Sequence, residues 1–272
     1  MTNRTTGHDT VSPMLLRAAN TILCNYSMTT TPNLENGRMG VCLFLYEYAR
    51  LTGIKEYEDI ADDMIDLILK ILKKGQNEEN ISSLSGIGIG IIYLITHQFL
   101  EDTDEHDSLE EVDNVLSKTI EMANTPSEMV TQSALYFIYR FIHYRIGIDR
   151  KKYRKVAKQL LTLFQGYKDL DEKDRTISEY ILQNVMMIYK LSQNEKNFLK
   201  EVYSLYEMAF IQNSEPLTTK KMWCCFLFNK RTQRKVINED TIFNLCQNCF
   251  YDADRAVGMM CCYTLTVMNQ NK

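Results

Sequence analysis

The feature that most constrains the fold is an internal repeat of two kinds of helix. One kind is amphipathic: in residues 54–74, apolar side chains recur on one helical face and acidic side chains on the other. The other kind is apolar nearly all round, as in residues 40–49 and in residues 84–99, which contain no charged residue. Since an amphipathic helix has one wet side and an apolar helix is buried on every side, the pattern predicts outer and inner helices.

The two kinds of segment alternate along the whole chain. Further apolar segments occupy residues 134–142, 180–189, 222–228 and 256–268, and further amphipathic segments occupy residues 11–26, 109–123, 153–164, 198–210 and 238–250. Approximate starts of the apolar segments are Gly40, Ile87, Ala134, Ile181, Trp223 and Val257, which lie 47, 47, 47, 42 and 34 residues apart. A period in the forties is typical of helical-hairpin repeats.

These repeats predict an all-α protein. Only 4 prolines occur in 272 residues, and no stretch alternates apolar and polar residues as a strand would. Two architectures fit: a closed (α/α) toroid, or barrel, of about six hairpins with an inner and an outer helix ring, and an open α-solenoid. The all-round apolarity of the inner set favours the toroid. No long linker interrupts the repeats, so we expect a single domain over residues 1–272.

Composition and charge exclude several classes of function. The 31 Lys and Arg against 35 Asp and Glu give a net charge of −4, which argues against nucleic-acid binding. The longest apolar run, residues 87–95, is far short of the roughly 20 residues that span a bilayer, so we expect no membrane span. The N-terminus lacks the pattern of a signal peptide. We therefore expect a cytoplasmic protein whose eight cysteines are mostly thiols.

Two glycine-rich segments resemble a known family. LENGRMGVCLFLYEYARLTG (34–53) and LSGIGIGIIYLI (84–95) each begin with closely spaced glycines and continue as an apolar helix. Over residues 34–118 the chain is similar to lanthionine synthetase C-like (LanC-like) proteins, whose inner helices begin with a G-x-x-G-x-x-x-[FL]-[FL] signature. The resemblance implies an α/α toroid. In full members it also implies a zinc enzyme that adds a peptide cysteine thiol to a dehydroamino acid.

The chain departs from this family at the zinc ligands. Full members bind zinc through two cysteines and a histidine, from a W-C-x-G motif and a later C-H-G motif. Trp223 and Cys224 resemble the W-C pair, but Phe226 stands where the motif has glycine. Tyr263 and Thr264 follow the later cysteines, and no histidine occurs after His143. The complete Cys/Cys/His set and the catalytic histidine are therefore missing, and no catalytic residue is assigned.

Six of the eight cysteines lie after residue 223, which raises a zinc hypothesis because C-x-x-C is a recurrent ligand pair. Here, however, CQNC falls within a helical pattern and the two Cys-Cys pairs fall within apolar runs, where cysteine behaves as a small buried hydrophobe. We expect core thiols and no cofactor, with zinc as the alternative. The candidate metal ligands are Cys224, Cys246, Cys249, Cys261 and Cys262.

Other patterns are more typical of structural roles. Gly86, Gly88 and Gly90 indicate close helix packing, since a nucleotide loop needs a preceding strand and another spacing. The four histidines are interpreted as structural or solvated. Carboxylates that a glycoside hydrolase would need occur at Glu35, Asp102, Asp104 and Glu128. For the acidic segment 101–107, a charged helix-capping turn is the favoured interpretation.

The sequence therefore predicts a LanC-like pseudoenzyme that binds a peptide or a protein partner, within a peptide-modification pathway that only the resemblance implies. The alternatives are enzymes: a divergent zinc-dependent thioether-forming cyclase using Cys224 with Cys261 or Cys262, and an (α/α)6 carbohydrate-active enzyme. A third hypothesis, a structural role without a ligand, predicts a large apolar patch on the outer helices.

Overall fold

The computed structural model describes residues 12–74, 78–101, 109–121 and 127–144, and a few later positions: Trp223, Val257, Met260, Cys261, Cys262, Thr264, Leu265 and Met268. Throughout these positions the regular structure is helical, as predicted, and none of them is in a β-strand. The chain divides into two compact units, residues 1–75 with 215–272 and residues 76–214, and each is described by itself. The single domain stays a prediction.

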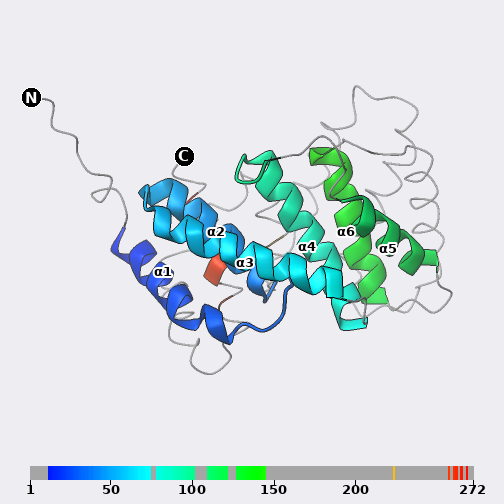
Figure 1. The fold of residues 1–272 in the computed structure, drawn as a ribbon, viewed down its shortest axis with the longest axis horizontal. Coiled ribbons are helices and arrows are strands. Elements are labelled where there is room, and N and C mark those ends of the chain that lie inside the picture. The colour runs from blue at the N-terminus through cyan, green and yellow to red at the C-terminus, as the bar shows by residue number, and fades with distance from the viewer. Residues whose placement is uncertain are drawn as a thin grey trace, which may run out of the picture. The chain divides into compact units, whose positions relative to one another are not determined.

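In the first unit, α1 spans Pro13–Asn25, a short 3-10 helix η2 spans Tyr26–Met28, α2 spans Arg38–Thr52 and α3 spans Lys55–Lys74 (Figure 1). The Ser12 hydroxyl caps α1 by accepting a hydrogen bond from the Leu15 N–H at 3.2 Å, and Pro13 follows at the first helical position. Gly53 ends α2 in the left-handed conformation, with φ at 70°. This turn folds α3 back onto α2 as a helical hairpin.

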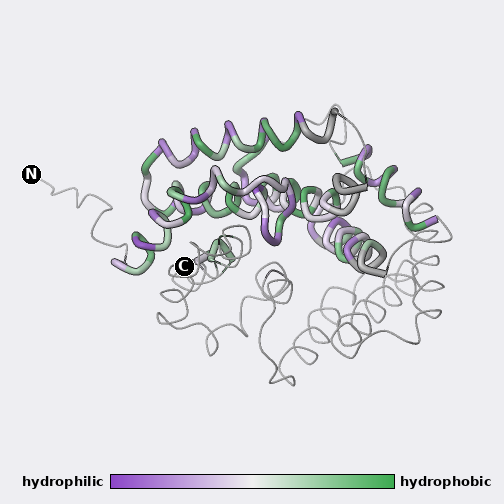
Figure 2. The backbone as a smooth tube through the Cα atoms, turned by 90° about the horizontal axis from the view of Figure 1, so that it is seen from below, coloured by the Kyte–Doolittle hydropathy of each residue, from purple (hydrophilic) through white to green (hydrophobic). Residues whose placement is uncertain are grey.

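The burial of this hairpin confirms the predicted inner and outer helices. Every residue from 39 to 49 in α2 is buried. In the part of α3 whose side chains are described, the buried residues are Ala61, Met64, Ile65 and Ile68, whereas the three aspartates between them are exposed. Figure 2 shows this alternation along α3, the long helix at the upper edge of the view. The helix that is apolar all round is thus inner, and the amphipathic helix is outer.

The second unit repeats the arrangement with α4 over Glu78–Thr96, α5 over Glu110–Glu121 and α6 over Ser127–His143. The inner helices α4 and α6 pack against each other, and the outer helix α5 packs on both. A Cβ at Gly88 of α4 would lie 2.5 Å from Cε2 of Tyr136 in α6, so only glycine allows this approach. The close-packing interpretation is confirmed for Gly88.

Boundaries differ from prediction in α6 and α4. The helix α6 begins at Ser127, seven residues before the predicted start at residue 134. The helix α4 begins six residues before its predicted start, because the segment 78–83 is helical as well. It ends at Thr96 rather than Phe99, because Gln98 adopts a left-handed φ of 61° and the Phe99 N–H turns back to the Leu94 carbonyl at 2.9 Å. None of the described helices combines the length and apolarity needed to cross a membrane.

The C-terminal positions belong to the same unit as the N-terminal hairpin. Val257, Met260, Cys261, Cys262, Thr264, Leu265 and Met268 are all helical and at most 1% exposed. The described positions of the predicted inner segment 256–268 are therefore helical and buried, as an inner helix requires. The all-helical structure is compatible with the predicted toroid, and closure of the ring stays a prediction.

Candidate functional site

Trp223, the tryptophan of the Trp-Cys pair, packs on the loop that leads into α2. Its indole Nε1 donates a hydrogen bond to the Glu35 carbonyl oxygen at 3.1 Å, and its side chain is buried. A Cβ at Gly40 would lie 2.9 Å from Cζ2 of Trp223 and 2.5 Å from the Leu34 carbonyl oxygen. Gly40 therefore allows the tryptophan ring to lie against the first turn of α2.

Hydrogen bonds fix the shape of this loop. The N–H groups of Arg38 and Met39, at the start of α2, donate to the carbonyls of Thr31 and Asn33 at 2.9 and 3.2 Å. The Asn33 side chain accepts from the Asn36 N–H at 3.0 Å, and a Cβ at Gly37 would overlap Asn33. The loop thus pairs the first N–H groups of the helix by itself, and the surface on which Trp223 packs is held by these hydrogen bonds.

Two of the five candidate zinc ligands, Cys261 and Cys262, lie in the described part of the chain. Both have 0% exposure inside the last helix. Adjacent helical residues point in different directions, so one metal ion would take at most one of the pair. The Thr264 hydroxyl donates a hydrogen bond to the Met260 carbonyl oxygen of the same helix.

The other three candidates, Cys224, Cys246 and Cys249, lie outside the described residues. No group of three His, Cys, Asp or Glu side chains suited to a metal ion occurs among the positions that are described. The donors do not fit the family's zinc site, because no histidine in the sequence follows residue 143 to complete a Cys/Cys/His set. That the chain takes no cofactor stays a prediction, with zinc binding by the late cysteines as its alternative.

Of the carboxylates proposed for a glycoside hydrolase, Glu35 is in the first unit and Glu128 is in the second. Glu35 lies in the loop before α2, where its backbone carbonyl accepts the Trp223 hydrogen bond. Glu128 lies in the first turn of α6, and Asp102 and Asp104 are outside the described residues. Sequence and structure therefore supply no described carboxylate pair for this chemistry.

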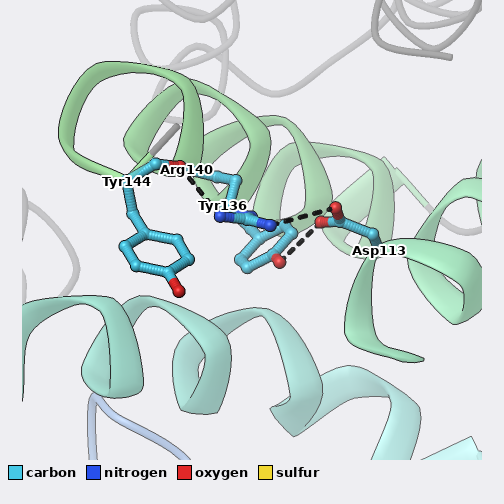
Figure 3. Close-up of polar contacts among 4 residues, drawn as sticks. All are labelled: Asp113, Tyr136, Arg140 and Tyr144. Atoms are coloured by element: carbon cyan, nitrogen blue, oxygen red, sulfur yellow. Dashed lines mark hydrogen bonds and ion pairs between the residues drawn. The ribbon is translucent and has the colours of Figure 1, made fainter. Parts of the chain in front are cut away.

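The second unit contains a buried ion pair that sequence reasoning missed (Figure 3). Arg140 of α6 is 0% exposed, and its Nη2 lies 3.6 Å from Oδ2 of Asp113 in α5. The Tyr136 hydroxyl donates to Oδ1 of the same carboxylate at 2.6 Å, and Arg140 Nη1 donates to the Tyr144 carbonyl at 2.8 Å. The Arg140 guanidinium also lies 4.6 Å from the centre of the Tyr144 ring. The contacts of Asp113 with Tyr136 and Arg140 link the outer helix α5 to the inner helix α6.

A sequence signal for this pair exists. Asp113 shares one helical face with Leu116 and Ile120, which are buried, and Arg140 interrupts an otherwise apolar inner segment. A charge within each of two neighbouring apolar patterns predicts a buried pair, because an unpaired buried charge is too costly. The pair is fully internal and structural.

Cys42 and Tyr46 make the corresponding polar contacts between α2 and α3. The Tyr46 hydroxyl donates to Oδ1 of Asp62 at 2.6 Å, and the Cys42 thiol lies 3.6 Å from the Ala61 carbonyl oxygen. Burial, together with the nearby Asp62 carboxylate, raises the pKa of the Cys42 thiol well above its usual range. Cys42 therefore stays a protonated thiol at neutral pH and is not a reactive nucleophile.

His97 and His143 lie at the C-terminal ends of α4 and α6, as predicted. The His97 ring stacks on Tyr93 with centroids 3.9 Å apart, and the His143 ring packs on Tyr139 at 4.3 Å. Nδ1 of His97 lies 2.9 Å from the Tyr93 carbonyl oxygen, a contact in which the ring must donate. Burial, with a smaller effect from His97, lowers the pKa of His143 to about 4. Both rings therefore support structure, and His143 is neutral at pH 7.

Comparison with protein families gives a match over the first part of the chain. The family model described as lanthionine synthetase C-like protein matches residues 29–180, which is more than half of the 272-residue chain. The matched range begins at the loop that seats Trp223 and includes α2 through α6. No curated protein and no solved structure matches the chain.

Proposed function

The chain belongs to the lanthionine synthetase C-like family, and on that premise we propose that it is a pseudoenzyme that binds a peptide or a protein partner. The observation that carries this proposal is the incomplete donor set. The residues that follow Cys261 and Cys262 are Tyr263 and Thr264, and every histidine lies at or before position 143. Zinc activation of a thiol needs the ligand set that these positions lack.

Retention of the scaffold supports a binding role over loss of all function. Trp223 donates a hydrogen bond to the Glu35 carbonyl oxygen and packs against Gly40, although the ligand motif around it is incomplete. The inner helices are buried all round in both units, which preserves the family's framework. Function lies in the site rather than in the fold, so a scaffold kept without its metal ligands favours recognition of the family's class of substrate, a peptide.

The proposal includes a reducing, cytoplasmic location and a role beside peptide-modifying enzymes. Cys24 and Cys42 are thiols in the structure, which agrees with a reducing compartment. The competing hypothesis is a divergent zinc-dependent cyclase that uses Cys224 with Cys261 or Cys262. The two hypotheses differ in whether a bound peptide is chemically changed.

The experiment uses one fluorescein-labelled peptide that contains a dehydroalanine and a cysteine four residues apart. Fluorescence anisotropy measures its binding, and thiol labelling followed by mass spectrometry measures ring formation, with and without added Zn²⁺. We expect binding without zinc and no loss of peptide thiol above the rate in buffer. Zinc-dependent loss of the thiol, abolished by Cys261→Ser but not by Cys24→Ser, would establish the cyclase instead. Failure of the peptide to bind would contradict the proposed peptide recognition.

A further inference from the structure

Asn36 and Gly37 form an Asn-Gly pair in the loop before α2, the single such pair in the sequence. Asparagine deamidates most readily before glycine, because glycine has no side chain to shield its backbone nitrogen. The Gly37 nitrogen loses its proton and bonds to Cγ of Asn36, while the bond from Cγ to Nδ2 breaks and ammonia leaves. Water then opens the cyclic imide to give aspartate or isoaspartate. The pair therefore needs only water to change chemically.

The fold requires this glycine for steric reasons. Gly37 has φ at −138°, which any residue adopts, but a Cβ there would overlap the backbone of Asn33. The Asn36 side chain is not required in the same way, because it forms no hydrogen bond with any described residue and its Oδ1 is buried. An unsatisfied buried oxygen destabilises a fold. The described structure therefore gives no packing reason for the labile asparagine.

The reacting groups are accessible, but the main chain between them is held. The Gly37 N–H donates to no described acceptor, and Asn36 is partly exposed, so water can enter and ammonia can leave. Ring closure must rotate the main chain of Asn36. Its N–H donates to Oδ1 of Asn33 at 3.0 Å, and its carbonyl oxygen accepts from the Thr31 hydroxyl at 3.3 Å. These two hydrogen bonds oppose the rotation.

Trp223 restrains the same segment from a distant part of the sequence. Its Nε1 donates at 3.1 Å to the carbonyl oxygen of Glu35, which belongs to the peptide bond directly before Asn36. Its ring lies against Gly40, where an added Cβ would be 2.9 Å from Cζ2. Trp223 thus contacts the chain on both sides of the Asn-Gly pair. Loss of these contacts would make the loop open more often.

We propose that Asn36–Gly37 is a spontaneous modification site whose rate is controlled by Trp223. While Trp223 packs on the loop, the main chain of Asn36 is held and the cyclic imide forms slowly. When Trp223 leaves, the ring closes and ammonia is lost. Isoaspartate adds a methylene group to the backbone within the loop that the Arg38 N–H and the Thr31 carbonyl oxygen close at 2.9 Å. The longer loop no longer fits Trp223, so the modification makes the opening permanent, whether or not a peptide binds.

The first arm of the test incubates the full-length protein at mildly alkaline pH and follows deamidation at residue 36 by peptide mapping in heavy-oxygen water. A synthetic peptide of residues 29–42 gives the rate without the fold. The folded parent should react about tenfold more slowly than this peptide, since the loop must open first. Trp223→Phe keeps most of the packing and loses the N–H donor, so it should raise the rate about fivefold. Trp223→Ala should raise the rate further.

Two control variants assign the effect. Asn36→Gln should abolish the signal, because glutamine must close a larger ring and does so far more slowly. Tyr136→Phe removes a hydroxyl that donates to Asp113 in the second unit at 2.6 Å, so it should leave the rate at Asn36 unchanged. Equal acceleration by Tyr136→Phe and Trp223→Phe would mean that global unfolding exposes Asn36, and would overturn the role of Trp223.

The second arm characterises the product. Protein deamidated at residue 36 should have a lower urea midpoint and a red-shifted fluorescence spectrum, because Trp223, the single tryptophan, becomes exposed to water. Asn36→Gln, incubated in the same way, should show neither change. If Trp223→Ala fails to fold, Trp223→Phe with a parent-like far-UV circular dichroism spectrum is sufficient for the first arm. A parent that reacts as fast as the peptide, a Trp223→Phe rate equal to the parent's, or a product with the parent's fluorescence overturns the proposal.

Discussion

The indole Nε1 of Trp223 donates its hydrogen bond to the Glu35 carbonyl oxygen at 3.1 Å, across 188 residues of sequence. This contact joins the Trp-Cys segment to the loop before α2. The same loop contains the Thr29 carbonyl oxygen, which accepts a hydrogen bond from Nε of Arg38 at 2.9 Å. Loss of the tryptophan is therefore expected to weaken the N-terminal hairpin as well as its own surroundings.

Trp223→Ala should lower the free energy of unfolding by about 3–5 kcal/mol, the usual cost of deleting a buried aromatic side chain. Trp223→Phe keeps most of the packing and loses the N–H donor, so it should cost about 1 kcal/mol. Urea unfolding followed by far-UV circular dichroism measures both, since Trp223 is the single tryptophan and fluorescence is lost with it. An unchanged urea midpoint for Trp223→Ala would contradict the packing of Trp223 on the loop before α2.

Gly40→Ala should cost about 1–3 kcal/mol, because its new Cβ would lie against Trp223 and the Leu34 carbonyl. In a Trp223→Leu background the cost should fall, since the smaller side chain can move away. Gly53→Ala is the control: it introduces strain from a φ of 70° with no atom within 4 Å, so its cost should not depend on residue 223. Equal Gly40→Ala costs in both backgrounds would show that the ring does not set the requirement for glycine.

Breaking the buried pair in the second unit should be strongly destabilising. Asp113→Ala leaves Arg140 charged and buried, with an expected loss of about 3–5 kcal/mol. Replacing both residues, as Asp113→Leu with Arg140→Met, should restore part of that loss because no charge is left unpaired. A double-mutant cycle on urea unfolding gives the coupling. Additive effects of the two single changes would mean that the pair does not interact.

Acid should weaken the fold through His143. Its pKa is lowered to about 4 in the folded state from an unfolded value near 6.5, so the unfolded chain binds the proton more tightly. The stability is fully present above about pH 6.5 and is lost as the pH falls toward 4, by up to about 3 kcal/mol. His143→Gln should flatten this part of the stability profile measured by urea unfolding between pH 7.5 and 4.5. His97→Gln, which removes only the smaller influence, should leave most of the slope.

Thiol reactivity should separate the cysteines of the native protein. Cys24 is exposed at the end of α1, whereas Cys42, Cys261 and Cys262 are buried. Iodoacetamide labelling read by mass spectrometry should modify Cys24 within minutes and leave the three buried positions unmodified until urea is added. Fast native labelling at Cys261 or Cys262 would argue against their place in the core.

The apolar periodicity of the sequence was sufficient to predict the helical hairpins. All-round apolarity predicted inner helices over residues 40–49 and 256–268: the first is buried on every side, and the described positions of the second are buried. Gly88 was correctly interpreted as a close-packing position. The Asp113–Arg140 pair was missed because the spacing of apolar residues shows which face of one helix is buried. It does not show which charged residues of two helices meet. The unsatisfied groups of Thr29 and Asn36 also could not be predicted, since they depend on how one loop folds against α2.

Zinc content separates a pseudoenzyme from a zinc-dependent cyclase, and elemental analysis measures it on untagged protein purified under reducing conditions from zinc-supplemented cells. A LanC-like protein without the complete ligand set should contain far less than one zinc per chain, and the content should be the same in Cys224→Ser and Cys261→Ser variants. About one zinc per chain in the parent protein, lost in both variants while Cys24→Ser retains it, would contradict the account and establish a zinc site built from the late cysteines.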